Sequence, residues 1–232
     1  MQQISDTLFA EDFLFDLEIA TPLLPSPYAH KPYVQIANFL SDALCKEIIS
    51  YCQSENDVTE AGLRSEKDSL NQKIRHTNIH KLSPSHLTLY NEALAKIRPT
   101  IEAFFSLSLT QATQPQLLEY TKGSFYKAHA DDSSVLMQEG LIKGFKQVAP
   151  QRKLTTLLFL SEPTQTTCDS FHYRGGELTF SFLKDAQGKT ATLTPKMGTI
   201  IVFGSNPYYT HEVHKVQEGH RYSIAQWHDA LM

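Results

Sequence analysis

Residues 116–131 read QLLEYTKGSFYKAHAD, and this stretch contains two short segments rich in strand-forming residues, 116–121 and 124–129. More segments of the same kind follow, separated by Gly, Pro, Asn and Asp. They span 153–161, 176–183, 190–194, 199–204, 210–216 and 221–228. About eight short strands with this spacing predict a sandwich or barrel rather than the alternating strands and helices of a parallel sheet.

The chain before this β-rich part contains helical signals. Ser41 is a good N-cap, and the apolar residues that follow it are spaced as on one helix face. Ser83 and Pro84 open a second helical region that reaches Phe105. Pro99 lies inside this region and predicts a kink or a break into two helices.

The remaining N-terminal segments are less regular. Residues 32–36 predict a strand, residues 1–31 an arm or short strands, and residues 53–73 a polar connection. We therefore expect one compact unit. In it, residues 1–115 form an N-terminal arm and helical support layer, and residues 116–232 form the β core. The helices would cover one face of the larger sheet.

Bulk composition excludes several classes of protein. The 232 residues carry a net charge of -4, with 20% charged and 41% hydrophobic residues, as in a soluble globular protein. We expect no nucleic-acid partner, because no basic face stands out. We also expect no membrane association and a cytoplasmic location, because residues 1–15 do not resemble a signal peptide and no apolar run reaches membrane length. The three cysteines, Cys45, Cys52 and Cys168, show no disulfide or metal spacing and are expected to be free thiols.

His129 and Asp131 form a His-x-Asp pattern at the end of a predicted strand. Residues i and i+2 of a strand point to the same face, so both side chains can reach one atom. The pattern alone is common by chance. His211, at the start of another predicted strand, supplies a second imidazole. Two imidazoles and one carboxylate on one face of a metal leave open positions, which is the ligand set of non-haem Fe(II) oxygenases.

Arg221 follows His211 by ten residues, and the segment 217–220 predicts a hairpin turn between their two strands. The turn would place Arg221 beside His211, with Ser223 on the same face of its strand. An arginine can bind a carboxylate through two parallel hydrogen bonds. Taken singly, each residue has an ordinary explanation, such as a hydrogen-bonded histidine or a surface arginine. The joint pattern is much less common by chance.

These residues resemble the prolyl-4-hydroxylase-like branch of the Fe(II)- and 2-oxoglutarate-dependent dioxygenases. The resemblance covers residues 32–52 loosely and residues 117–228 well. Its motifs are Pro32 to Ser41, Tyr120, Tyr126, His129 and Asp131, Arg152 to Leu160, Gly175 to Leu178, Lys196 to Phe203, His211 to Val213, Gly219 to Ile224, and Trp227.

The resemblance implies a double-stranded β-helix (jelly-roll) core of the mainly β or α+β class, flanked by N-terminal helices. It also implies Fe(II), 2-oxoglutarate and O₂, with hydroxylation coupled to the conversion of 2-oxoglutarate to succinate and CO₂. The iron ligands would be His129, Asp131 and His211. An aspartate rather than Gly or Ala at position 131 argues for hydroxylation and against halogenation.

The resemblance also suggests roles for further side chains. Arg221 and Tyr120 would bind 2-oxoglutarate. Tyr126, Arg152 and Trp227 would lie on the substrate side, although aromatic residues beside such a core are more often packing residues.

Two departures from the family pattern have consequences. Phe159 stands where some prolyl hydroxylases have a tyrosine whose hydroxyl helps to hold the distal carboxylate of 2-oxoglutarate, so Arg221 and another group would have to hold it. Residues 132–151 form a long insert whose apolar residues are spaced partly like a short helix. The insert is either a packed surface loop or a lid over the active site.

The expected function is hydroxylation of a peptidyl or protein residue, with proline as the first candidate. A hydroxylase of a free amino acid or small metabolite is the alternative within the same enzyme class. A non-catalytic iron or 2-oxoglutarate sensor and a cupin-type metal protein are alternatives from other classes. The intact ligand set argues against the sensor, and the spacing of Arg221 argues against the cupin.

Overall fold

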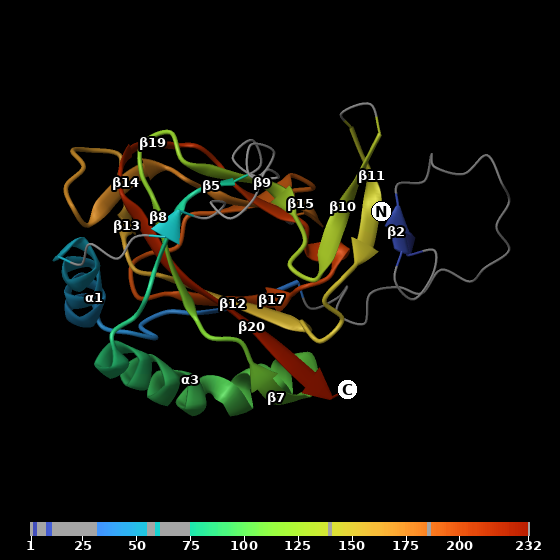
Figure 1. Ribbon diagram of the computed structural model, residues 1–232, viewed down its shortest axis with the longest axis horizontal. Coiled ribbons are helices and arrows are strands. Elements are labelled where there is room, and N and C mark those ends of the chain that lie inside the picture. The colour runs from blue at the N-terminus through green and yellow to red at the C-terminus, as the bar shows by residue number, and fades with distance from the viewer. Residues whose placement is uncertain are drawn as a thin grey trace, which may run out of the picture.

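The computed structural model describes residues 2–3, 8–10, 32–54, 59–60, 75–138, 141–184 and 187–231. Two main antiparallel sheets face each other, and helix α3 covers the outer face of the larger one (Figure 1). This arrangement confirms the predicted jelly-roll core with N-terminal helices. The predictions for residues 1–31 and 53–73 fall largely outside the described residues.

The larger sheet has eight strands. Its order is β3 (Val34–Ile36), β17 (Ile200–Gly204), β12 (Leu154–Phe159), β20 (Arg221–Leu231), β8 (Gln116–Tyr120), β6 (Asn78–His80) and β4 (Thr59–Glu60), with β7 (Ser108–Ala112) also pairing with β20. The five-stranded sheet has the order β16 (Thr190–Leu193), β15 (Leu178–Lys184), β18 (His211–Val213), β9 (Phe125–His129) and β5 (Arg75–His76). Each of the eight predicted strands is present, with ends that differ by a few residues.

Two smaller sheets complete the β structure. One has the order β13 (Glu162–Pro163), β14 (His172–Gly175) and β19 (Val216–Gly219). The other has the order β1 (Gln2–Gln3), β2 (Leu8–Ala10), β11 (Leu141–Gln147) and β10 (Ser133–Gln138). The partly helix-like spacing in the insert 132–151 does not give a helix in the described residues, because β10 and β11 pair as an antiparallel hairpin. Phe145 anchors this hairpin by packing, fully buried, against Ala130.

The two helices begin where the sequence predicts. Helix α1 (Asp42–Ser54) follows Ser41 and buries the apolar face that contains Cys45 and Cys52. Helix α3 (Pro84–Phe105) begins after Ser83, whose hydroxyl accepts a hydrogen bond from the backbone N–H of His86.

The sequence predicts a kink or a break at Pro99, and the break is wrong, because helix α3 is continuous through this residue. Pro99 lies on the exposed face of the helix, whereas Ile101 and Phe105 are buried. Burial of the opposite face therefore outweighs the loss of one backbone hydrogen bond at the proline.

No helix in the described part of the chain combines the length and hydropathy that a membrane span requires.

The hairpin predicted at residues 217–220 is also wrong. Strand β19 lies between His211 and Arg221, and it pairs with β14 instead of joining β18 directly to β20. Gly219, with φ 75°, turns the chain from β19 into β20, and a Cβ there would lie 2.1 Å from the carbonyl oxygen of His172. His211 and Arg221 consequently belong to different sheets, and they approach each other across the core.

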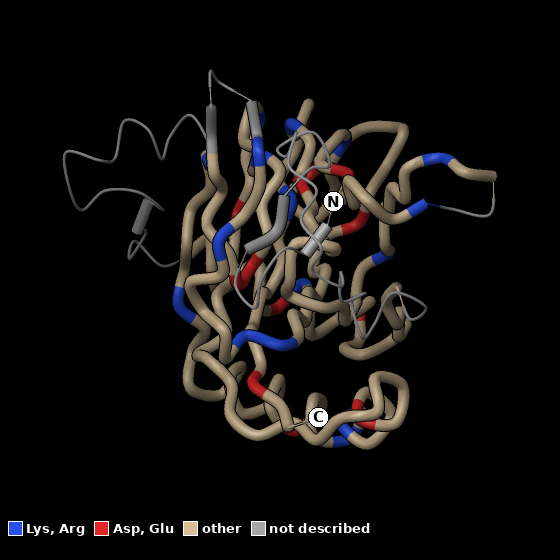
Figure 2. Tube along the Cα trace, turned by 90° about the vertical axis from the view of Figure 1, so that its right-hand side faces the viewer, with Lys and Arg blue, Asp and Glu red and all other residues tan. Residues whose placement is uncertain are grey.

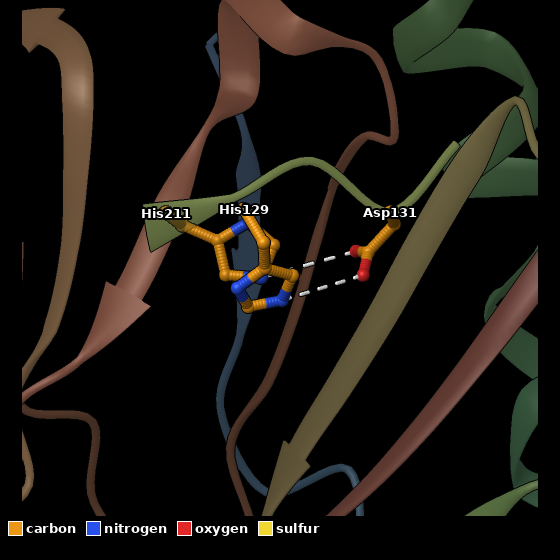
Figure 3. Close-up of side chains that lie close together, drawn as sticks. All are labelled: His129, Asp131 and His211. Atoms are coloured by element: carbon orange, nitrogen blue, oxygen red, sulfur yellow. Dashed lines mark ion pairs between the residues drawn. The ribbon is translucent and has the colours of Figure 1, made fainter. Parts of the chain in front are cut away.

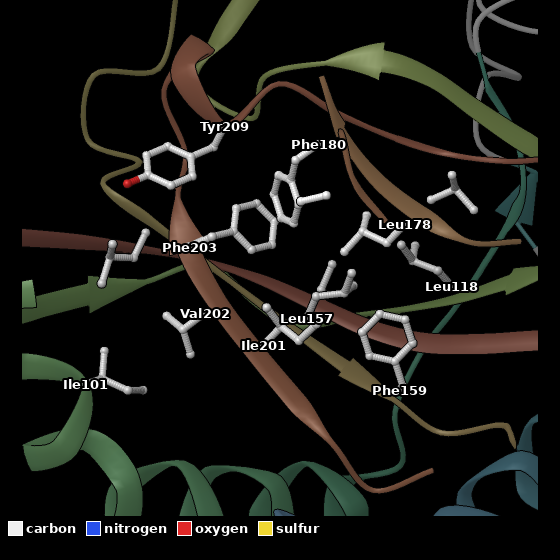
Figure 4. Close-up of a cluster of buried hydrophobic side chains, with 14 of the residues drawn as sticks. Ile101, Leu118, Leu157, Phe159, Leu178, Phe180, Ile201, Val202, Phe203 and Tyr209 are labelled. Atoms are coloured by element: carbon white, nitrogen blue, oxygen red, sulfur yellow. The ribbon is translucent and has the colours of Figure 1, made fainter. Parts of the chain in front are cut away.

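The main hydrophobic core lies between the two large sheets. Leu157, Ile201 and Phe203 come from the larger sheet, and Leu178 and Phe180 face them from the five-stranded sheet (Figure 4). This packing sets the separation of the sheets around the polar side chains described below.

Positive and negative side chains are interspersed along the described chain, as Figure 2 shows.

Candidate active site

His129, Asp131 and His211 converge between the two large sheets (Figure 3). Nε2 of His129 lies 3.7 Å from one carboxylate oxygen of Asp131, and Nε2 of His211 lies 3.9 Å from the other. One ligand atom from each residue lies within 4.8 Å of the other two. The three side chains can therefore hold one metal ion from one side.

Strand pairing places the two histidines together. His129 ends β9 and His211 begins β18, and these two residues are direct partners in the antiparallel register. Asp131 follows in the turn between β9 and β10, after the bridge of Ala130 with Ser133. The His-x-Asp pattern thus works through a strand end and the adjoining turn.

Both imidazoles are oriented by backbone carbonyls. Nδ1 of His129 lies 2.8 Å from the carbonyl oxygen of Lys127, and Nδ1 of His211 lies 2.9 Å from that of Tyr209. A carbonyl oxygen only accepts hydrogen bonds, so each Nδ1 is the donor and each Nε2 keeps a free lone pair. This tautomer is the one that binds a metal through Nε2.

The electrostatics of the cluster suit a cation. Burial, together with the charge of His211, lowers the pKa of His129 to about 3, so its imidazole is neutral at physiological pH. Burial raises the pKa of Asp131, but the two histidines and a hydrogen bond from Thr155 outweigh that effect and hold it below its usual value. Two imidazoles and one carboxylate are the donor set that suits Fe(II) in oxygenases.

Thr155 on β12 fixes the carboxylate of Asp131. Its hydroxyl donates to Oδ2 of Asp131 over 2.6 Å, and it also lies 2.9 Å from the hydroxyl of Ser205. The eight-stranded sheet therefore orients Asp131, whereas the two histidines lie on paired strands of the five-stranded sheet.

The three residues line one end of a cavity between the sheets. The other lining residues are Arg75, Leu118, Tyr120, Tyr126, Thr155, Leu157, Leu178, Phe203, Val213, Arg221, Ser223, Ala225 and Trp227. The cavity thus combines apolar side chains with polar and charged groups that could orient a ligand, as in a small-molecule site.

Arg221 lines the same cavity from the eight-stranded sheet and is 0% exposed. Its Nη1 donates to the hydroxyl of Ser223 over 3.2 Å. Its Nε and Nη2 are buried without a hydrogen-bond partner, and no acidic residue in the described ranges forms an ion pair with it. A buried guanidinium without a counter-ion is costly, so this group fits an anionic ligand such as a carboxylate.

Aromatic rings flank the guanidinium of Arg221. Its Cζ lies 5.1 Å from the ring centroid of Tyr120 and 4.9 Å from that of Phe159. Phe159 therefore contacts the side chain of Arg221 but offers it no hydroxyl. The residue that the sequence singled out as a departure lies directly at this end of the site.

The predicted substrate-side residues lie near the histidines. Tyr126 stacks on His129, with ring centroids 3.5 Å apart. Arg152 lies over the ring of Trp227 at 4.3 Å and donates to the backbone carbonyl of Asp131 over 2.8 Å, but it does not itself line the cavity. Nε1 of Trp227 is buried without a hydrogen-bond partner in the described structure, and its proximity helps to lower the pKa of Asp131.

Two cavity residues were not anticipated from the sequence. Arg75 on β5 lines the cavity and lies 4.8 Å from the ring of Tyr126, and Thr155 holds Asp131. Thr155 lies in a predicted strand, where a polar residue in an otherwise apolar run was a usable signal. Arg75 lies in a two-residue strand that follows residues with no clear pattern, so the sequence offered little to identify it.

Comparisons with known proteins agree with this geometry. The model of the 2OG-Fe(II) oxygenase superfamily matches residues 115–229, about half of the chain, which include all three clustered residues and Arg221. No curated protein matches the sequence.

Solved structures share the fold. A prolyl-4-hydroxylase from Pseudomonas putida has a TM-score of 0.61 and 23% identity, over 87% of this chain and 94% of that one. A viral collagen prolyl hydroxylase from Paramecium Bursaria Chlorella virus-1, solved with 2OG, has a TM-score of 0.57 and 20% identity, over 87% and 97%. A Trichoplax adhaerens prolyl hydroxylase, solved with a peptide fragment of hypoxia inducible factor, has a TM-score of 0.57 and 17% identity, over 87% and 85%.

Proposed function

This chain belongs to the 2OG-Fe(II) oxygenase superfamily, and from that premise we propose that its cavity hydroxylates a residue of a peptide or protein, with proline as the first candidate. The chain is a dioxygenase whose family uses Fe(II), 2-oxoglutarate and O₂. One observation supports the proposal above all others. A cluster that can bind a metal and a buried arginine without a counter-ion among the described residues line the same cavity.

His129, Asp131 and His211 are the proposed iron ligands. The free Nε2 atoms and the carboxylate held by Thr155 are already directed toward a common point. When bound there, iron would supply the redox chemistry that couples oxidation of the 2-oxo acid to hydroxylation of the substrate. The protein contributes the geometry of the three ligands and the apolar cavity around them.

Arg221 is the proposed partner for the distal carboxylate of 2-oxoglutarate. The 2-oxo acid end of the molecule would face the metal ligands, and its C5 carboxylate would meet the unpaired Nε and Nη2 of Arg221. Ser223 already engages Nη1 and leaves those two nitrogens for the ligand. Tyr120, beneath the guanidinium, would close this end of the cavity.

The substrate would approach the opposite end, near Tyr126 and Trp227. Both rings line the cavity, and each is covered by an arginine, Arg75 or Arg152. Asp131, one of the proposed iron ligands, is the only acidic residue that lines the described cavity, so no other acid is present to bind the ammonium group of a free amino acid. The lack of a second acid in the described cavity lining favours a peptidyl substrate, because a residue within a peptide has no free ammonium group.

The experiment that tests the proposal uses purified protein without oxygen, to which Fe(II) and then 2-oxoglutarate are added. We expect a visible charge-transfer band, followed by succinate release when air is admitted. His129→Ala should abolish both signals. His228→Ala is the matched control, because His228 is a buried histidine on β20 that does not line the cavity.

Each outcome has a distinct meaning. Iron binding without any binding of 2-oxoglutarate would refute the role of Arg221. Binding of both without succinate, even when peptides are supplied, would support a sensor. If succinate is released, prolyl peptides and free amino acids should be compared as substrates by mass spectrometry. Addition of one oxygen atom to free amino acids alone would refute the peptidyl assignment.

A further inference from the structure

The end of the cavity around Arg221 lacks a hydroxyl group at one position. Phe159 is 1% exposed and lies against the guanidinium, and its side chain has no hydroxyl. The benzene ring cannot donate or accept a conventional hydrogen bond. Nε and Nη2 of Arg221 are left without partners on the protein side.

Tyr173 brings a hydroxyl to the same place from a different strand. It lies on β14, which pairs with β19 in the small three-stranded sheet. The residue is 1% exposed, and its hydroxyl oxygen is buried without a hydrogen-bond partner in the described structure. A buried hydroxyl that makes no hydrogen bond is unfavourable, so packing alone would be served better by phenylalanine.

Gly176 brings Tyr173 and Arg221 together. A Cβ at Gly176 would lie 2.9 Å from Cδ of Arg221 and 3.4 Å from Cε2 of Tyr173. The two side chains therefore meet over a position that has no side chain of its own. The φ of 67° at Gly176 is a conformation that other residues rarely adopt, so this gap is built into the backbone.

Electrostatics agree with this proximity. Burial raises the pKa of Tyr173, and its interactions with Arg221 oppose that effect. The phenol is therefore neutral at physiological pH and can accept a hydrogen bond through its oxygen. Tyr173 does not line the cavity, whereas Arg221 does, so any effect of the phenol on a ligand would pass through the guanidinium.

We infer that Tyr173 is a positioning residue for 2-oxoglutarate. Its hydroxyl, unpartnered in the described structure, would accept a hydrogen bond from an N–H of Arg221 that Ser223 and the distal carboxylate leave free. This bond would hold the guanidinium toward the distal carboxylate, a task for which Phe159 offers no hydroxyl. This inference rests on the proposed role of Arg221 in binding that carboxylate. It adds a residue from β14 to a site whose other members come from the two large sheets.

The test compares two 2-oxo acids. Pyruvate has the same 2-oxo acid group as 2-oxoglutarate but no distal carboxylate. Affinities for both would be measured by calorimetry on the anaerobic Fe(II) protein, for the wild type and for Tyr173→Phe. The variant should bind 2-oxoglutarate about 10-fold more weakly, as for loss of one hydrogen bond to a charged group. Its affinity for pyruvate should change by less than about twofold.

Tyr90→Phe is the matched control. Tyr90 is also fully buried, but its hydroxyl bonds to Gln226 and Thr156, which do not line the cavity. This variant should bind both 2-oxo acids as the wild type does. Equal loss of both affinities in Tyr173→Phe would indicate a structural role and overturn the inference, as would unchanged affinity for 2-oxoglutarate.

A second variant covers the case in which Tyr173→Phe does not fold. Phe159→Tyr in the wild-type background adds a hydroxyl on the other side of Arg221. We expect no gain in affinity for 2-oxoglutarate, because Tyr173 already holds the guanidinium. A gain of about 10-fold would show that Arg221 lacked this support and would overturn the inference. If the wild type binds neither 2-oxo acid, the proposed function itself fails.

Discussion

His129 and His211 are direct partners across strands β9 and β18, and their ring centroids lie 4.3 Å apart. The separation of the two proposed imidazole ligands is thus set by one pair of neighbouring strands. Backbone carbonyls hold each ring so that Nε2 faces the cavity. Asp131 differs from them, because it lies in a turn and depends on a side chain of the larger sheet.

Thr155→Val should weaken iron binding. The change removes the hydroxyl that donates to Asp131 but keeps the shape of the side chain. We expect the affinity for Fe(II) to fall about 10- to 100-fold, as for other groups that orient metal ligands. Competition with a chelator would measure it. Thr156→Val is the control, because Thr156 is equally buried on the same strand but bonds to His228, and an equal loss in both variants would contradict the assignment.

Arg221→Met should separate the binding of iron from the binding of 2-oxoglutarate. Affinity for iron should stay the same, while affinity for 2-oxoglutarate should fall by at least about 100-fold, because a buried charge pair is lost. Without ligands, the variant should be no less stable than the wild type, since an unpaired buried charge is replaced by an apolar chain of similar length. Urea unfolding would measure stability. A large loss of stability would mean that the guanidinium has a structural partner instead.

Gly176→Ala should displace the side chain of Arg221. The added methyl group would lie 2.9 Å from Cδ of Arg221, at a backbone φ of 67°. We expect a loss of about 1–3 kcal/mol in the free energy of unfolding and weaker binding of 2-oxoglutarate. Gly188→Ala is the control, because Gly188 has a φ of 78° but no atom within 4 Å of the added Cβ. Equal effects in both variants would attribute the loss to backbone strain alone.

The stability of the protein should depend on pH through Glu119. Burial raises the pKa of this carboxyl, but hydrogen bonds from His220, His80, Tyr222 and Asn78 outweigh burial and hold its pKa far below the usual value of 4.5. A lowered carboxyl pKa means that the stabilisation is complete above the ordinary pKa and is lost as the pH falls through the lowered one. The free energy of unfolding should therefore decline as the pH falls below about 4.5.

The carboxylate of Glu119 also makes the stability of the protein fall as the pH rises, through its interaction with His220. Its hydrogen bond raises the pKa of His220, so this contribution is complete below 6.5 and is lost as the pH rises through the raised value. Glu119→Gln should lower stability by about 2 kcal/mol at neutral pH and flatten both dependences. Urea titrations between pH 3 and 8 would test both parts, and an unchanged pH profile in the variant would contradict them.

The sequence predicted those features that depend on local spacing. The eight strands of the core and the convergence of His129, Asp131 and His211 follow from short patterns that fold as their periodicity indicates. The position of Arg221 in the cavity was also anticipated, although by a hairpin that does not exist. The strand of Arg221 reaches the cavity from the opposite sheet, because β19 pairs with β14 and separates β18 from β20. That pairing joins residues distant in sequence, so local spacing did not reveal it.

Other features were beyond sequence reasoning for the same reason. The spacing in residues 132–151 favoured a short helix, but pairing of β10 with β11 overrode it. Tyr173 lies far in the sequence from Arg221. Its ring approaches Arg221 only because both side chains pack over Gly176. The direction of a side chain across a core depends on the whole fold, so a single sequence considered alone does not reveal it.

The two ends of the site belong to different sheets. His129 and His211 stand on the five-stranded sheet, and Arg221 stands on the eight-stranded sheet. A 2-oxo diacid that reaches both ends would therefore act as a spacer between the sheets, and the thickness of the hydrophobic core would select its chain length. Diacids one methylene shorter or longer should bind less well, and truncation of a core side chain such as Leu157 should alter that preference without touching either end.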